Sequence, residues 1–243
     1  MKSFNMISNP SLSSSLKKYQ ANYHTVVPFN EKKDRLVLMN FTASNKDLTD
    51  EVINDEHRFA SYINQKIKTA NALYGIGGYK EHREIYRNSK NFDALKPGEE
   101  PRRLHLGIDI WGEAGTPIYA FTGGMIHSFA FNNKAGDYGA TLILLHQLDG
   151  IPFYSLYGHI SFNDINNIQA GHYVNRGQEI AHIGKYDENG NWPPHLHFQI
   201  IYDIEMKKGD YPGVCAYGEK EKYLNNCPDP DIVLNMMQYA VNE

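Results

Sequence analysis

The stretch His195-Leu-His-Phe-Gln-Ile-Ile201 alternates polar and large apolar residues, and this pattern is typical of a β-strand. Successive side chains of a strand point to opposite faces of a sheet. The imidazoles of His195 and His197 should therefore project the same way, while Leu196 and Phe198 point the other way. A His-x-His pair is weak evidence for a functional site when it stands alone. Its meaning depends on which other segments lie beside it.

Five short runs upstream of this stretch also have the character of strands, because they are apolar and bounded by Gly, Asp, Asn or Pro. They cover residues 116–120, 124–131, 140–146, 153–157 and 179–183. Strands so short and so closely spaced favour an antiparallel sheet or sandwich over a parallel α/β sheet. The fold is therefore predicted to be mainly β.

The chain divides into three predicted parts. Residues 1–100 are expected to form an N-terminal extension, an arm followed by a helix, that ends in a Pro- and Glu-rich linker. Residues 101–205 contain the short β runs and are expected to form the main domain. Residues 206–243 are rich in loop-forming residues, with a terminal helix expected from Asp231, and are predicted to pack on that domain. Helices and sheet together give an α+β class overall.

The helix of the extension is expected between about residues 50 and 73, where apolar residues recur at helical spacing after the candidate cap Thr49. A cluster of glycines follows, at Gly75, Gly77 and Gly78. These glycines lack the spacing of a dinucleotide-binding loop and follow a helix rather than a strand. They are interpreted as a helix stop and turn.

The composition excludes two classes of partner. The 243 residues carry a formal charge of −4 without a long run of Lys and Arg, which argues against a nucleic-acid binder. The mean hydropathy is −0.54, and no apolar stretch is long enough to span a membrane. The sequence also shows no secretory signal, and its two cysteines, Cys215 and Cys227, are expected to stay as thiols. A cytoplasmic location is therefore predicted.

A possible metal site begins with His105-Leu-Gly-Ile-Asp109. In a straight strand these two side chains would share a face but lie roughly 13 Å apart, too far to hold one ion. Gly107 between them permits a bend or bulge that brings them together. Imidazole and carboxylate are ligands that suit zinc. Taken alone, the pair is better explained as a surface histidine and a turn aspartate.

A third segment, Leu156-Tyr-Gly-His-Ile-Ser161, places His159 after an apolar run, at an expected turn. Side chains at such turns can reach a cleft, although an exposed turn histidine is an equally ordinary reading. The co-occurrence of the three segments in one β-rich region favours a common site over three unrelated explanations.

These residues resemble the lysostaphin-type, or β-lytic, zinc metallopeptidases, which cut peptide cross-links in bacterial cell walls. The resemblance runs from about residue 103 to 201. It rests on the order and spacing of His105-Leu-Gly-Ile-Asp109, Gly115-Thr-Pro-Ile-Tyr-Ala120, Asp137-Tyr-Gly-Ala-Thr-Leu-Ile-Leu-Leu-His146, Leu156-Tyr-Gly-His159, Gly171-His-Tyr-Val-Asn-Arg-Gly-Gln-Glu-Ile-Ala181 and Pro194-His-Leu-His-Phe198.

The resemblance implies a role for each matching residue. One zinc ion would be held by His105, Asp109 and His197, in a groove of the β domain. His159 and His195 would be the catalytic imidazoles, and which of the two is the base stays open. The implied activity is hydrolysis of a peptide bond in peptidoglycan-type or Gly- and D-amino-acid-containing peptides. No substrate-binding residue is assigned.

Three features depart from the family pattern. The usual wall enzymes are exported, and no export signal is visible in this sequence. The segment at 185–194 differs from the small Gly- and Thr-rich loop that is usual before the histidine pair. The chain also has long flanks, and with Cys227-Pro-Asp-Pro230 it looks more like the subgroup of domains fused to aminotransferase-like modules. The chemistry is therefore better predicted than the substrate.

Two other functions compete with a peptidase. The first is a catalytically altered, metal-binding module that recognises a peptide or amino-sugar ligand through the same groove. The second is a lipoyl or biotinyl carrier, which is disfavoured because the only lysine between the two hairpin-like segments, Lys134, lies in an Asn-rich loop. Residues Tyr79, Arg83 and Tyr86 of the extension are interpreted as a solvated helical face rather than as part of the site.

Overall fold

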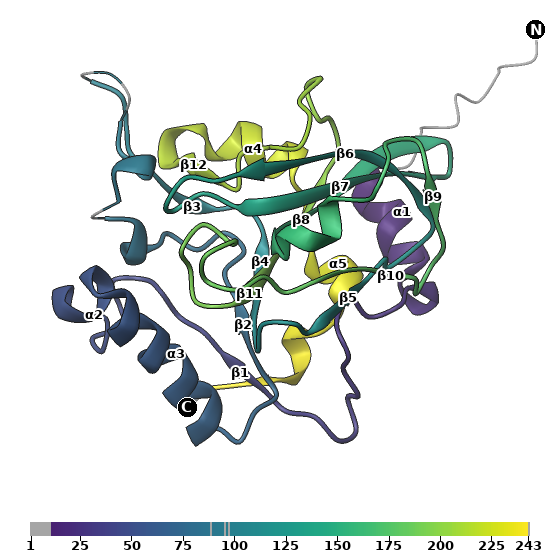
Figure 1. Ribbon diagram of the computed structural model, residues 1–243. Coiled ribbons are helices and arrows are strands. Elements are labelled where there is room, and N and C mark those ends of the chain that lie inside the picture. The colour runs from purple at the N-terminus through teal and green to yellow at the C-terminus, as the bar shows by residue number, and fades with distance from the viewer. Residues whose placement is uncertain (1–10, 88, 95, 97, 243) are drawn as a thin grey trace, which may run out of the picture.

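The computed structural model describes residues 11–87, 89–94, 96 and 98–242, and a large mixed β-sheet dominates it (Figure 1). Within this part of the chain, nine strands form the sheet in the order β13-β1-β2-β4-β11-β8-β7-β6-β9. Their bounds are β1 Leu36–Leu38, β2 Tyr74–Gly77, β4 Ile108–Trp111, β6 Gly124–Asn132, β7 Gly139–Leu148, β8 Ile151–Ile160, β9 Tyr173–Val174, β11 His195–Ile201 and β13 Ala240–Val241. The prediction of a mainly β fold is confirmed.

Two further pairs of strands lie outside the large sheet. Strand β10 (Glu179–His182) pairs antiparallel with β5 (Pro117–Tyr119), and β12 (Val214–Ala216) pairs antiparallel with β3 (Arg102–His105). Within the large sheet, β1 is parallel to both of its neighbours, whereas the other pairs are antiparallel. The sheet is therefore mixed rather than antiparallel throughout. The parallel strands come from the N-terminal extension and the C-terminus.

The helices are short. Among the described residues they are α1 Leu12–Lys18, α2 Asp50–Asn54, α3 Glu56–Thr69, α4 Lys220–Asn226 and α5 Asp231–Leu234. Short 3-10 turns lie at η1 Gln20–Asn22, η2 Glu84–Tyr86, η3 Lys90–Phe92, η4 Phe162–Ile165, η5 Tyr217–Glu219 and η6 Met237–Tyr239. In the part of the chain that is described, no helix is long and apolar enough to cross a membrane.

The predicted helix of the extension is two helices. Thr49 caps α2 as expected, because its side chain accepts a hydrogen bond from the backbone N–H of Val52. Asp55 then leaves the helical conformation and accepts hydrogen bonds from the backbone N–H groups of His57 and Arg58. It therefore ends α2 and caps α3 at once. The capping potential of Asp55 was hidden in the sequence by the continuous apolar spacing on both sides.

The interpretation of the glycine cluster as a helix stop is wrong, because Gly75 and Gly77 lie in strand β2. They pair with Trp111 and Asp109 of β4. A Cβ at Gly75 would lie 2.2 Å from the side chain of Met39, and one at Gly77 would lie 2.7 Å from the carbonyl oxygen of Met39. Glycine is required here by the close approach of a neighbouring segment, a reason that local sequence does not reveal.

The two faces of the sheet have different characters. One face carries the main apolar core, to which β4 and β11 contribute Ile108, Ile110, Leu196, Phe198 and Ile200. Helix α1 and the C-terminal α5 pack on this core. The opposite face carries the acid and the histidines of the candidate site. Helix α3 packs beside them in a second cluster that includes Phe41, Phe59 and Trp111. The N-terminal extension thus supplies strands β1 and β2 of the sheet, and its helix α3 covers part of the face that carries the site.

Buried His146 is held in one neutral form between β7 and β8. Its Nδ1 donates to the carbonyl of Gly123, and its Nε2 accepts from the hydroxyl of Ser155, at 2.9 and 2.7 Å. The ring also stacks on Phe153. Burial lowers the pKa of His146 to about 4 from its ordinary value of 6.5. This residue is part of the core.

The buried His146 predicts a loss of stability in mild acid. Its pKa is lower in the folded than in the unfolded chain, so the unfolded state takes up the proton first. The contribution of neutral His146 to the free energy of unfolding is complete above pH 6.5. It is lost as the pH falls toward about 4, and the loss is about 3 kcal/mol at most. Urea unfolding of wild type and His146→Gln across this range tests this expectation. The variant should show the shallower decline, and equal declines would contradict the assignment.

Candidate active site

Strand register brings the acid and the histidine pair together. On β11, His197 lies directly opposite Asp109 of β4, and His195 lies opposite Trp111. Residues that face each other across two strands share one side of the sheet. The alternation predicted for the His-x-His segment is therefore present, with both imidazoles and the carboxylate on the face away from the main core.

His105 reaches the same point through a break in the chain. Strand β3 ends at His105, β4 begins at Ile108, and the two strands belong to different sheets. The turn between them contains Gly107, where a Cβ would lie 2.5 Å from Cε1 of His197. Because of this bend, His105 Nε2 and Asp109 Oδ1 are only 3.4 Å apart. In a straight strand the two side chains would be separated by roughly 13 Å. The role expected of Gly107 fits this geometry.

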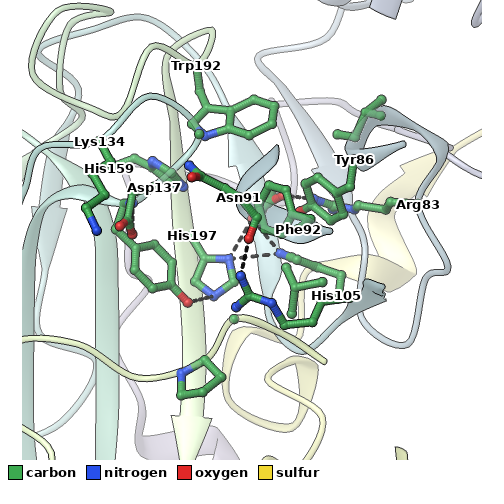
Figure 2. Close-up of a pocket in the computed structure, with 18 of the residues that line it drawn as sticks. Arg83, Tyr86, Asn91, Phe92, His105, Lys134, Asp137, His159, Trp192 and His197 are labelled. Atoms are coloured by element: carbon green, nitrogen blue, oxygen red, sulfur yellow. Dashed lines mark hydrogen bonds and ion pairs between the residues drawn. The ribbon is translucent and has the colours of Figure 1, made fainter. Parts of the chain in front are cut away.

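Three potential ligand atoms converge at the centre of the site. His105 Nε2 lies 2.9 Å from His197 Nδ1, which lies 3.0 Å from Asp109 Oδ1. All three residues are at most 2% exposed. Figure 2 shows His105 and His197 directed toward each other in the pocket. Among the described residues, this is the group of histidine and acidic side chains whose ligand atoms lie close enough to share a metal ion.

The outward atoms of both histidines have partners that fix their tautomers. Nδ1 of His105 lies 3.1 Å from the carbonyl oxygen of Gly78 and must donate to it, so Nε2 keeps a lone pair. Nε2 of His197 lies 3.0 Å from Oε1 of Gln199 and donates to it, so Nδ1 keeps a lone pair. The amide of Gln199 is held in turn, 3.2 Å from the carbonyl of Pro212. Outer partners of this kind orient metal-ligating histidines.

The charges of the group also favour a cation. Burial alone would raise the pKa of Asp109, but the adjacent Arg83 guanidinium and the neighbouring histidines hold it well below its ordinary value. Burial lowers the pKa of His105 to about 3, and the positive charge of Arg83 acts in the same direction. The Asp109 carboxylate and the unprotonated Nε2 of His105 therefore lie close together at neutral pH. This donor set suits zinc and leaves room for a fourth ligand.

His159 joins the group through an irregularity of β8. In regular pairing it would follow Gly158, which lies opposite His197, and would point to the core face. Its backbone instead has a φ of 61°, and the register of β7 and β8 shifts nearby. A left-handed conformation is uncommon for residues other than glycine and clusters at functional sites. It places the His159 ring 4.1 Å from the ring of His195.

The two candidate catalytic imidazoles are held alike. Nδ1 of His159 donates to the carbonyl of Asn189 at 2.7 Å, and Nδ1 of His195 donates to the carbonyl of Pro193 at 2.8 Å. The indole of Trp111 stacks on His195 with the centroids 3.9 Å apart. Burial lowers the pKa of His195 to about 4 and the pKa of His159 well below its ordinary value. Both Nε2 atoms therefore carry lone pairs and can accept a proton.

The site lies in a pocket of about 330 Å³ that is lined by residues from all three predicted parts of the chain. The β domain supplies the five residues described above, together with Tyr138 and Trp192. Tyr138 lies with its hydroxyl 3.4 Å from Nε2 of His197. Figure 2 shows Trp192 across the pocket from His105. The N-terminal extension supplies a wall that includes Tyr86 and Phe92, which stack at 4.1 Å between centroids.

The interpretation of Tyr79, Arg83 and Tyr86 as a solvated helical face is wrong. Arg83 is 1% exposed and Tyr86 is 5% exposed. Arg83 lies in an extended segment before η2, and its guanidinium contacts Asp109. Nothing in the local sequence distinguishes this arginine from the charged residues around it. The signal lies in tertiary pairing with β4, which a single sequence does not display.

A comparison with known protein families finds a match that covers the five residues of the candidate site. Residues 103–210 match the model of peptidase family M23. The matched range, called the M23 segment below, contains all five residues predicted for the site and ends before β12. Arg83 and Gly78 lie outside it. The family match and the donor set together support a metallopeptidase domain in this segment, and the group of His105, Asp109 and His197 is compatible with a zinc site.

Similar proteins match less than half of the chain. The "Uncharacterized lipoprotein YgeR" of Escherichia coli (strain K12) is 35% identical over 96 residues, which are 40% of this chain and 34% of that protein. The "DD-carboxypeptidase/endopeptidase Mpg" of Neisseria meningitidis serogroup B is 33% identical over 97 residues, 40% of this chain and 20% of that protein. The similarity thus spans about a third of the first relative and a fifth of the second.

Among solved structures, the catalytic domain of the antimicrobial peptidase lysostaphin from Staphylococcus simulans is 22% identical, with a TM-score of 0.38. The alignment covers 69% of this chain and 98% of that domain. A TM-score this low adds nothing to the family match. The narrower resemblance to domains fused to aminotransferase-like modules stays a prediction, as do the domain boundaries and the cytoplasmic location.

Proposed function

We propose that this protein is a zinc-dependent peptidase that uses His105, Asp109 and His197 to hold one metal ion and hydrolyses a peptide bond beside it. The convergence of these three ligand atoms next to two further imidazoles carries the proposal. The M23 match and the name of the Neisseria relative, a carboxypeptidase and endopeptidase, support the class of reaction. Peptidoglycan-type peptides, with Gly or D-amino acids at the cut bond, are the proposed substrates.

The chemistry divides between the metal and the imidazoles. A zinc ion bound here would lower the pKa of a coordinated water toward 7 and polarise a carbonyl group. The chain's own task is to move the proton of that water. His159 and His195 both present an unprotonated Nε2, because their Nδ1 atoms are committed to backbone carbonyls. Either ring can therefore accept a proton in the first step.

A proton on one ring changes what that ring can do. The Nε2 that has accepted a proton becomes a donor, either toward negative charge on the carbonyl oxygen or toward the leaving amine. The rings lie 4.1 Å apart, so protonation of one disfavours protonation of the other. The pair therefore carries one proton at a time. Trp111, stacked on His195, fixes the position of that ring.

A chelator-sensitive cleavage assay tests the proposal. Purified protein loaded with zinc should hydrolyse Gly-rich or D-amino-acid-containing peptides, and activity should vanish on chelation and return with added zinc. Mass spectrometry of the products identifies the bond. Cleavage that is indifferent to chelation would contradict a metal-dependent reaction.

The alternative of a metal-binding module that does not hydrolyse its ligand makes a different prediction in the same assay. The peptide would then bind in a zinc-dependent manner and be recovered intact. His159 and His195 each have Nδ1 bound to a backbone carbonyl and Nε2 free to accept a proton. This arrangement favours hydrolysis, because a binding module has no need of two proton acceptors beside the candidate metal ligands.

A further inference from the structure

The candidate metal site has a charged partner from outside the M23 segment. Arg83 belongs to the N-terminal extension and is fully buried at 1% exposure. Buried arginines are rare unless their charge is paired. Arg83 is paired with Asp109, whose Oδ2 lies 2.6 Å from Nη1 of the guanidinium. Figure 2 shows Arg83 entering the pocket from the same side as Tyr86.

This contact divides the two oxygens of the carboxylate between two tasks. Oδ2 accepts from Arg83, while Oδ1 faces Nδ1 of His197 and Nε2 of His105. A carboxylate with one oxygen occupied by a short charge-assisted hydrogen bond has its rotation fixed. The free oxygen then points at the position between the histidines.

The arginine is itself held from two sides. Its Nε donates to Oε2 of Glu81 at 2.8 Å, and its Nη1 also donates to the hydroxyl of Tyr86 at 2.9 Å. Glu81 supplies a second carboxylate, so the arginine and the two acids together keep one net negative charge. The attraction of the group for a cation is therefore preserved despite the buried guanidinium.

Gly78 adds a second contact from the same extension. Its carbonyl accepts from Nδ1 of His105, which leaves Nε2 as the ligand atom. A Cβ at this position would lie 2.0 Å from Nη2 of Arg83, and the backbone has a φ of 111°. The glycine therefore allows the arginine and the histidine to pack against the same turn.

We infer that Arg83 is a positioning residue for the metal site, and that the N-terminal extension, through Arg83 and Gly78, completes a ligand group whose members all come from the M23 segment. This inference rests on the proposed function, because it assumes that the group binds a metal. It predicts that zinc affinity depends on the guanidinium, independently of any peptide.

The variant Arg83→Lys tests this inference. Lysine keeps the buried positive charge but lacks the planar fork that reaches Asp109, Glu81 and Tyr86 together. We expect the affinity for zinc, measured by competition with a chromophoric chelator, to fall by about 10- to 100-fold. The visible absorption of the Co²⁺-substituted protein should also change, because the carboxylate is no longer fixed. The thermal transition of the metal-free variant establishes that it is folded.

Matched variants separate this role from a general effect of arginine. Arg87→Lys changes a neighbouring arginine that is part-exposed and pairs with Asp50 and Glu84, so its zinc affinity and Co²⁺ spectrum should equal those of wild type. If Arg83→Lys does not fold, Glu81→Gln is the second test, since it loosens the hold on Nε and leaves Arg83 and Asp109 in place. Its zinc affinity should fall measurably, by about two- to tenfold, which is less than the loss expected for Arg83→Lys.

The outcomes distinguish this inference from the proposed function. A folded Arg83→Lys protein with wild-type zinc affinity and Co²⁺ spectrum would overturn the positioning role while leaving the peptidase proposal intact, and so would an unchanged affinity in Glu81→Gln. Failure of the wild-type protein to bind zinc would overturn both.

Discussion

Replacing His197 by alanine is expected to abolish stoichiometric zinc binding. His197 supplies the nitrogen that lies within 3.0 Å of both other ligand atoms, so its loss leaves only two ligands. Catalytic zinc sites use three protein ligands. Metal analysis after dialysis should fall from one zinc per chain to a small fraction, with peptide hydrolysis lost in parallel. Retention of one zinc per chain by this variant would contradict the ligand assignment.

Asp109→Ala should lose zinc as well. Unlike His197→Ala, it should also lower the free energy of unfolding of the metal-free protein by a large amount. Removing the carboxylate leaves the buried charge of Arg83 with only Glu81 to offset it. Breaking one partner of a buried ion pair costs about 3–5 kcal/mol. Chemical unfolding of the two metal-free variants should therefore place Asp109→Ala well below His197→Ala. Equal stabilities would show that the Arg83 contact contributes little to the fold.

Replacing His195 by alanine is expected to leave zinc binding intact and to lower turnover by about 10²- to 10⁴-fold. The Nε2 of His195 is directed toward no partner among the described residues, and its Nδ1 is occupied by the carbonyl of Pro193. The ring is therefore placed to move a proton rather than to bind the metal. Steady-state kinetics with metal analysis on the same sample measures both quantities.

The control for this prediction is His172→Ala, which removes an exposed imidazole remote from the pocket lining. It should keep wild-type turnover and zinc content. Normal hydrolysis by His195→Ala would show that the proton passes through another group, with His159 as the first to examine.

Local pattern predicted the central strands of the fold. The alternation in His195–Ile201 specifies a strand with two imidazoles on one face, and this is the arrangement found opposite Asp109. The bend at Gly107 was also predictable, because two ligands four residues apart cannot meet along a straight strand.

The contribution of the N-terminal extension was not predictable from local pattern. Gly75 and Gly77 have the local signature of a helix stop, yet they form a strand because β4 offers an edge to pair with and Met39 packs against them. Arg83 likewise has the local surroundings of a surface residue. Its burial depends on Asp109, 26 residues further along the chain, and on the acid at Glu81.

The left-handed backbone conformation of His159 was also not predictable from the local sequence pattern. Pairing of β8 with β11 would place this residue on the core face, and only the irregular backbone turns it toward His195. The sequence predicted a turn at this point, whereas His159 lies inside strand β8, and the pattern did not predict the direction of its side chain. The position of His159 beside the candidate metal ligands was therefore predicted from the co-occurrence of the three segments and from the resemblance to a known family, not from local pattern.

Anomalous X-ray scattering at the zinc edge from crystals of the zinc-loaded protein tests the central claim most directly. The account predicts one strong peak within bonding distance, roughly 2.0–2.2 Å, of His105 Nε2, His197 Nδ1 and Asp109 Oδ1. A peak elsewhere, or none in crystals that metal analysis shows to have been loaded, would contradict it.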